Sequence, residues 1–221
     1  MANYWQDFEK IYCKLADITD KGRWGVWQVL KTFTLYHGTD VEAARKIIVE
    51  GFKTKPSKEH WLGNGIYFYF DRSLAEWWTT RPTNKFGTSI QHPALVKCGI
   101  SVEEERVLDM RKLKNYLQFV DKYRKEFWPY VINGRITVTE KDAKFFDEKQ
   151  LRCAFCDYLF NRYELDAIVG TFDLQGQPYL PEPNTYGEYF DTFNLRYIET
   201  QFCVKNKEII TKTEVEEIME G

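Results

Sequence analysis

The chain of 221 residues lacks an apolar run that approaches the length of a membrane-spanning helix. Its first ten residues, MANYWQDFEK, have neither the apolar core of a secretory signal nor the basic character of a transit peptide. It also lacks an excess of one charge, because 31 Lys and Arg residues and 33 Asp and Glu residues give a formal net charge of −2. This balance argues against a generally basic nucleic-acid-binding surface, although it permits a local patch. We therefore expect a cytoplasmic protein with no membrane partner.

Cysteine is scarce and scattered. The five cysteines are Cys13, Cys98, Cys153, Cys156 and Cys203. An odd number without regular spacing does not resemble the disulfide framework of a small secreted protein. Cys153 and Cys156 form a C-x-x-C motif, a pattern that occurs in half of a zinc site or in a redox pair. No second C-x-x-C or nearby histidine pair completes a zinc site. Residues 151–160 have the pattern of a buried helix, so we interpret both cysteines as core residues and expect no metal.

Aromatic residues are abundant. They make up 17% of the chain, with 7 Trp, 14 Tyr and 16 Phe, and hydrophobic residues as a whole make up 43%. Such a composition excludes an intrinsically disordered chain and offers many stacking partners for a flat ligand. The length suits one domain with a sizeable core, so we predict a single domain over residues 1–221.

Residues 34–51 have the pattern of a strand followed by a helix. A short run of β-forming residues at 34–36 ends in His37 and Gly38, where we predict a backbone elbow because glycine adopts dihedral angles that other residues avoid. Asp40 or Thr39 is a suitable N-cap for the helix, and Gly51 ends it. The apolar residues at helical spacing are Val41, Ala44, Ile47 and Ile48.

A second unit of the same kind follows. Gly63-Asn64-Gly65 precedes residues 66–70, whose β-branched and aromatic content favours a strand. Asp71 and Ser73 then offer caps for a helix that carries Trp77. The two units each place one polar side chain, His37 or Tyr67, near the edge of a strand.

These motifs carry a family resemblance. The series L-Y-H-G-T, A-x-x-I-x-x-x-G-F, G-x-G-I-Y-F and S-x-A-x-W resembles the NAD-binding half of ADP-ribosyltransferases of the His-Tyr-Glu type, which include the poly(ADP-ribose) polymerases and their bacterial relatives. The resemblance covers about the first third of the chain. It implies an α+β ADP-ribosyltransferase-like fold, with two facing, mostly antiparallel sheets, an NAD cleft between them and helices around the rim.

The resemblance also implies roles for single residues. The backbone of Gly38 would hold the nicotinamide amide, and His37 would bind a hydroxyl of the adenosine ribose. Tyr67 would stack on nicotinamide, and Trp77 would form a second aromatic wall. The NAD-binding set implied in this way is His37, Gly38, Thr39, Gly65, Tyr67 and Trp77.

The third catalytic group is expected on a late strand, residues 196–204, whose alternating pattern gives it two distinct faces. The family has a carboxylate here, and the register against Q-F-C-V puts Gln201 at that position. An amide does not act as a general base. Glu199 lies two residues earlier on the same face of the strand, so both Gln201 and Glu199 are candidates.

The remaining segments complete the expected fold. We predict N-terminal helices within residues 1–33, the second of them over 22–33, and a helical insertion over 111–163 made of helices at 111–130 and 142–163. Residues 93–102, 106–110 and 165–171 have strand patterns. Two irregular loops, 79–92 and 176–187, are candidates for the determinants of the acceptor.

The expected function is transfer of a single ADP-ribose from NAD, used as a substrate, to a macromolecular acceptor that is a protein or a nucleic acid. By the resemblance, a small enzyme of this kind acts as a toxin or in host–phage conflict, with an antitoxin or inhibitor protein as a further partner. Two alternatives use the same cleft. An NAD glycohydrolase would use water as acceptor, and a non-catalytic module would bind NAD or ADP-ribose without turnover, as Gln201 in place of a glutamate suggests.

Overall fold

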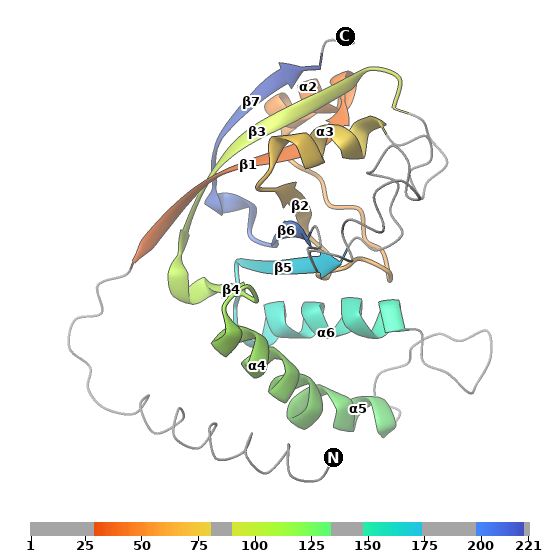
Figure 1. The fold of residues 1–221 in the computed structure, drawn as a ribbon, viewed down its shortest axis with the longest axis vertical. Coiled ribbons are helices and arrows are strands. Elements are labelled where there is room, and N and C mark those ends of the chain that lie inside the picture. Colours follow the sequence, from red (N-terminus) through yellow and green to blue (C-terminus); the bar gives the residue numbers. More distant parts are fainter. Residues whose placement is uncertain (1–28, 81–89, 134–147, 174–197, 219–221) are drawn as a thin grey trace, which may run out of the picture.

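A computed structural model describes residues 29–80, 90–133, 148–173 and 198–218 of the chain. The described chain has the α+β architecture that the sequence predicts, with a mixed seven-stranded sheet and helices packed on it (Figure 1). The strands are β1 (Leu30–Asp40), β2 (Ile66–Tyr69), β3 (Pro93–Glu103), β4 (Val107–Asp109), β5 (Ala167–Asp173), β6 (Ile198–Val204) and β7 (Ile210–Glu217). The helices are α2 (Val41–Glu50), α3 (Arg72–Thr80), α4 (Leu113–Lys122), α5 (Trp128–Ile132) and α6 (Glu148–Arg162).

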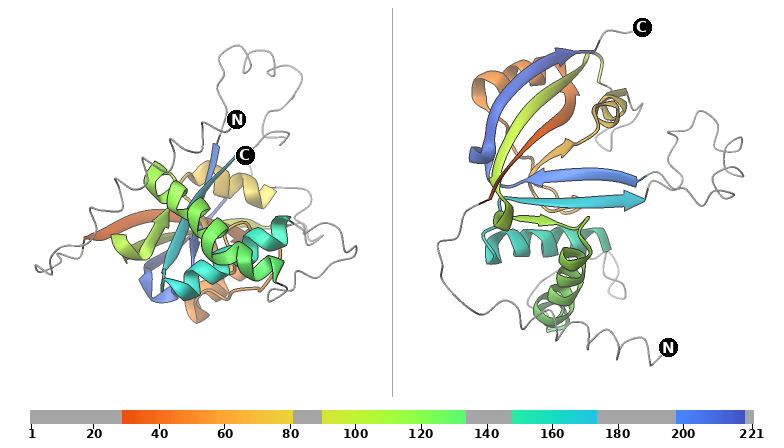
Figure 2. Two further views of the ribbon diagram at one scale, coloured as in Figure 1. Left: turned by 90° about the horizontal axis from the view of Figure 1, so that it is seen from below. Right: turned by 60° about the vertical axis from the view of Figure 1, so that its left-hand side comes forward.

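The strands follow the order β4-β5-β6-β2-β1-β3-β7, and their pairing is antiparallel except between β4 and β5. β1 pairs with β3 along its whole length but with β2 at one position, where Tyr36 lies opposite Tyr69. Two arms, β1-β3-β7 and β2-β6-β5-β4, diverge from this junction (Figure 2). We predicted two facing sheets, but the pair Tyr36 and Tyr69 joins the two arms into one continuous sheet.

Helices cover both arms. α2 and α3 lie on opposite faces of the β1-β3-β7 arm, and α4, α5 and α6 lie beyond β4 and β5 (Figures 1 and 2). Side chains of α2 reach a core cluster around Leu35 and Phe68, while Leu74 and Ala75 of α3 form a smaller cluster with Tyr69. A third cluster joins α6 to the other face of β5 and β6.

In the strand-helix unit predicted over 34–51, the helix is confirmed but the strand is longer than predicted. The Asp40 side chain accepts a hydrogen bond from the Glu42 amide, and Gly51 ends α2 with a φ of 75°, so both predicted caps are confirmed. β1 begins at Leu30 and continues to Asp40, so the helix predicted over 22–33 is wrong for its last four residues. These residues pair with β3 from Glu103 inward, and this long-range pairing overrides the local helical pattern.

The later elements mostly follow their patterns. β2, β3, β4, β5 and β6 fall within or beside the strands predicted for them, and α4, α5 and α6 lie between β4 and β5, in the range predicted for a helical insertion. A π-helical turn at Tyr123–Phe127 separates α4 from α5, and β7 has no counterpart among the predicted strands. The first of the predicted N-terminal helices, most of the loop at 79–92 and the loop at 176–187 lie outside the described residues.

Candidate functional site

The three strands that carry His37, Tyr67 and Gln201 are neighbours in the sheet. β1 provides His37, β2 provides Tyr67 and β6 provides Gln201 and Glu199, in the spatial order β6-β2-β1. Tyr69 of β2 lies directly opposite Gln201, and Tyr67 lies opposite Cys203. The fold therefore brings the third motif next to the first two across a long stretch of sequence.

His37 is held by the backbone of β2. Its Nδ1 atom lies 2.7 Å from the carbonyl oxygen of Tyr67, and because a carbonyl only accepts, Nδ1 carries the hydrogen and Nε2 the lone pair. The ring meets Phe52 and Phe68 edge-on, with centroid distances of 5.3 and 5.9 Å. Burial lowers the pKa of His37, although the bond to Tyr67 partly opposes this shift, so the imidazole is neutral at pH 7.

Tyr67 is bound to the loop that precedes its own strand. Its hydroxyl donates to the Gly63 carbonyl and accepts from the Leu62 amide, both at 2.7 Å. Burial raises the pKa of Tyr67 far above its ordinary value, so the phenol stays protonated. Its ring lies beside His60, with centroids 5.5 Å apart. In this arrangement the Tyr67 side chain fixes the loop at 62–63 against the sheet.

Gly38 owes its place to close packing. It lies within β1 rather than at the predicted elbow, and a side chain there would overlap the Ala75 carbonyl and approach Thr79 Cγ2 to 2.8 Å. The absent Cβ lets α3 approach the strand. Thr39 follows Gly38 on β1, and Trp77 lies half-buried on α3, so these predicted NAD-binding residues are on adjoining elements.

Gly65 plays a similar role where the loop enters β2. A Cβ at this position would lie 2.5 Å from Cys203 Sγ and 2.6 Å from the Val204 carbonyl oxygen. The loop passes directly over β6 for this reason. Close packing on β6 thus accounts for the glycine at position 65, in addition to its predicted role in binding NAD.

Gln201 and Glu199 form a buried polar pair on β6. Glu199 is 6% exposed, and the Gln201 Nε2 amide donates to its Oε1. Because a carboxylate only accepts, the amide nitrogen faces Glu199 and the amide oxygen turns away. That oxygen, Gln201 Oε1, is buried without a hydrogen-bond partner in the described part of the chain. The two candidates for the third group therefore contact each other, and the acceptor Gln201 Oε1 is left without a partner among the described residues.

The predicted residues divide between the two faces of the sheet. Side chains alternate along a strand, so Tyr67, Gln201 and Glu199 leave the sheet on one face. The His37 ring lies on the other face, among the cluster that contains Phe52 and Phe68. The structure brings Tyr67, Gln201 and Glu199 to one face but separates the His37 ring from them.

Sequence reasoning missed the network that holds the loop at 57–65 on α6. Asp157 accepts hydrogen bonds from the Asn64 amide at 2.8 Å and from Asn64 Nδ2 at 2.6 Å. Lys205 adds a bond to the Asn64 carbonyl at 3.1 Å, and the Ser57 amide donates to Asn64 Oδ1 at 2.7 Å. Asn64 stands out in sequence as the polar residue between two glycines, but no local signal connects it to Asp157.

A second missed group lies beside this network. Arg152 of α6 places its guanidinium 4.0 Å from the centre of the Trp61 ring, and Trp61 meets Phe172 edge-on at 4.6 Å. Arg152 was overlooked because one arginine in a helix resembles any solvated charge. Trp61 was overlooked because it lies in a loop without a periodic pattern.

The C-x-x-C is part of the core, as predicted. Cys153 and Cys156 are buried on α6, and burial raises the pKa of each thiol. Cys156 packs against Gly63, where a Cβ would lie 3.0 Å from Cys156 Cβ. Gly63 has a φ of 83°, a left-handed conformation that favours glycine at this contact.

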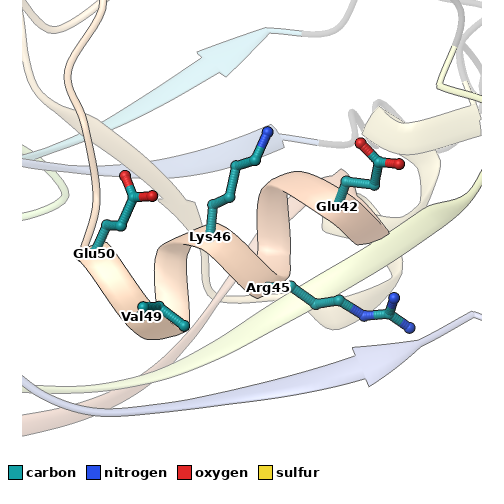
Figure 3. Close-up of a pocket in the computed structure, with 5 residues that line it drawn as sticks. All are labelled: Glu42, Arg45, Lys46, Val49 and Glu50. Carbon is teal, nitrogen blue, oxygen red and sulfur yellow. The ribbon is translucent and has the colours of Figure 1, made fainter.

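An open hollow lies away from these residues. It runs along the outer side of α2 and is lined by Glu42, Arg45, Lys46, Val49 and Glu50 (Figure 3). Its lining comes from one helix and mixes both signs of charge, so we assign no function to it. Within the described ranges, no helix has the length and apolar character needed to cross a membrane, and no His, Cys, Asp or Glu side chains gather in threes around a possible metal position.

Comparison with known proteins places the chain in a family without assigning an activity. No protein-family model matches the chain, and no solved structure gives a significant match. Over 195 residues, the chain is 30% identical to the uncharacterized protein MJ0359 of Methanocaldococcus jannaschii, and the match covers 82% of this chain and 86% of the archaeal protein. The chain therefore belongs to the same family as this archaeal protein.

Proposed function

We propose that this chain is a mono-ADP-ribosyltransferase that transfers ADP-ribose from NAD to a protein or nucleic-acid acceptor. The observation that carries the proposal is the adjacency of β1, β2 and β6, the strands on which the His-Tyr-Glu resemblance predicts the three motif residues. β1 and β2 also separate beyond Tyr36, since their ladder consists of the pair Tyr36 and Tyr69.

The Gln201–Glu199 pair suits the ribose that carries nicotinamide. Gln201 Oε1 is a buried acceptor without a partner among the described residues, and a ribose hydroxyl is a group that can donate to it. NAD would supply the bond between nicotinamide and ribose, whose cleavage develops positive charge on the sugar. The Glu199 carboxylate, bonded to the amide of Gln201, would stabilise that charge and accept a proton from the acceptor.

The decisive experiment combines labelled NAD with separate pools of protein, DNA and RNA. The wild-type chain should label one pool and release nicotinamide. Glu199→Gln should reduce labelling at least about 100-fold because it removes the carboxylate and preserves its shape. Glu59→Gln, at an exposed position, is the matched control and should label normally.

The outcome in each arm has a distinct meaning. Labelling by Glu199→Gln at the wild-type rate would exclude the proposed role of Glu199. Free ADP-ribose formed from NAD alone would identify a glycohydrolase instead of a transferase. Absence of nicotinamide release in every arm would reject the transferase.

One observation favours a non-catalytic NAD-binding module as the second candidate. The Tyr67 hydroxyl already bonds to Gly63 and Leu62, and Gln201 does not act as a base. A module of this kind would bind NAD in a calorimetric titration and release no nicotinamide with any acceptor pool. Loss of NAD binding in Gln201→Ala would then locate the bound ribose.

A further inference from the structure

Part of the Arg152 guanidinium, on α6, is buried without hydrogen-bond partners among the described residues. Its Nε and Nη2 atoms are buried and have no hydrogen-bond partner in the described part of the chain. A guanidinium remains protonated at all ordinary pH values, and burying a cation without a partner is unfavourable. Proteins retain a buried guanidinium where an anion binds to it and balances its charge.

The neighbours of Arg152 do not supply that anion. Cys156, Tyr67 and Cys153 lie close enough to interact with it electrostatically, but burial raises the pKa of all three, so they are neutral at pH 7. Glu148, one turn earlier on α6, is exposed and interacts more weakly than those three groups. The positive charge is therefore left without a full counter-charge from these groups.

The surroundings hold the guanidinium in one orientation. It stacks on Trp61, which is itself supported edge-on by Phe172. The loop that carries Trp61 is tied to α6 by Asn64 and Asp157, and the next residue along the helix, Cys153, donates to the Ser57 carbonyl at 3.3 Å. Trp61 remains 39% exposed, so the ring on which the guanidinium stacks lies at the surface. A cation held in advance loses little entropy when an anion binds.

We propose that Arg152, stacked on Trp61, is a binding site for the phosphate group of a small ligand. Nε and Nη2 form the side-on fork of the guanidinium, and this fork matches two oxygens of one phosphate. A phosphate carries up to two charges and three acceptor oxygens, so it compensates a buried guanidinium more fully than a carboxylate does. The proposal does not require the NAD reaction, since inorganic phosphate and a nucleotide both offer this chemistry.

The test measures binding by calorimetry in a buffer free of phosphate. Inorganic phosphate, ADP and adenosine are the three probes, and the first two should bind the wild-type chain while adenosine should not. Arg152→Gln should weaken the binding of phosphate and ADP at least tenfold. Arg162→Gln is the matched control, because Arg162 lies on the same helix beside an aromatic ring and is exposed. It should change binding less than twofold.

Two further measurements separate binding from folding. Without phosphate, Arg152→Gln should have a melting temperature equal to or above that of the wild-type chain, because it removes an uncompensated buried charge. If Arg152→Gln fails to fold, Arg152→Lys keeps the charge but loses the fork and should still weaken phosphate binding several-fold. A phosphate affinity unchanged in the variant that folds, or no binding of either phosphate probe by the wild-type chain, would overturn the proposal. ADP binding without phosphate binding would identify the nucleotide as the source of the group. Nicotinamide release is not part of this test, so its result is independent of the proposed transferase.

Discussion

Tyr67 and Phe68 are adjacent on β2, yet their side chains enter two different environments. Phe68 is fully buried in an apolar cluster that includes Leu35, Phe52 and Phe202. Tyr67 enters the opposite side, where its hydroxyl bonds to the loop at 62–63 and where Cys203 and the Gln201–Glu199 pair also leave the sheet. One face of the central strands is packed mainly with hydrocarbon, whereas the other combines an apolar cluster from α6 with several polar groups.

The polar face costs more to bury than the apolar face, because each polar group needs a partner. Most of these groups find one within the chain, as Tyr67 does with Gly63 and Leu62. Gln201 Oε1 and two atoms of the Arg152 guanidinium have none among the described residues. The phosphate proposal arises from the Arg152 atoms, and Gln201 Oε1 supports the transferase proposal, since a buried polar atom without a partner is expected where a ligand binds.

The largest effect is expected on the apolar face. Phe68→Ala should reduce the free energy of unfolding by about 3–5 kcal/mol, because it removes a fully buried ring and leaves a cavity beside Phe52 and His37. Urea denaturation measures this loss. Val49→Ala, at a residue that is 84% exposed, is the control and should stay within about 0.5 kcal/mol of the wild-type chain. A loss below about 1 kcal/mol for Phe68→Ala would show that this face is not the main source of stability.

A smaller effect is expected from the neighbouring residue. Tyr67→Phe keeps the ring but removes the hydroxyl, so the Leu62 amide and the Gly63 carbonyl each lose a partner. We expect a loss of about 1–3 kcal/mol in the free energy of unfolding, again by urea denaturation. Tyr116→Phe on α4, at a residue that is 50% exposed, should change stability by less than about 0.5 kcal/mol. Equal stability of Tyr67→Phe and the wild-type chain would mean that the hydroxyl is free for a ligand.

The same comparison explains what the sequence could predict. The alternation in residues 196–204 was enough to assign two faces to β6, and the structure confirms this, since Phe202 and Cys203 enter different clusters. The caps of α2 followed from Asp40 and Gly51, because their chemistry acts within a few residues. Features that depend on residues within one element could therefore be predicted from the sequence.

Contacts between segments far apart in the chain could not be predicted from the sequence. The extension of β1 back to Leu30 depends on pairing with β3, and the position of Asn64 depends on Asp157 in a helix far along the chain. The candidate site was predictable as a set of residues on three strands, but not the face on which each side chain would lie. Arg152 entered the site through the packing of the loop on α6, which no local pattern encodes.

His37 provides the smallest test, because it is a polar group on the apolar face. Burial lowers its pKa below the ordinary value of 6.5, so as the pH falls the unfolded chain binds a proton before the folded chain does. The free energy of unfolding should therefore fall with pH from 6.5 down to the folded-state pKa, by at most about 1.4 kcal/mol per pH unit from this residue. Well above pH 6.5 both states are neutral at this position, so the contribution is constant.

His37→Asn isolates this effect, because the Asn amide has a donor near the position of Nδ1 and does not titrate. Urea denaturation at pH 5.5 and 7.5 should show a smaller pH-dependent loss of stability in His37→Asn than in the wild-type chain. His92→Asn, at an exposed position, should retain the wild-type difference. Equal losses in the wild-type chain and His37→Asn would mean that the imidazole is protonated as easily in the folded chain as in the unfolded one. In that case the His37 ring would be open to water and free to meet a ribose hydroxyl, as the family resemblance implies.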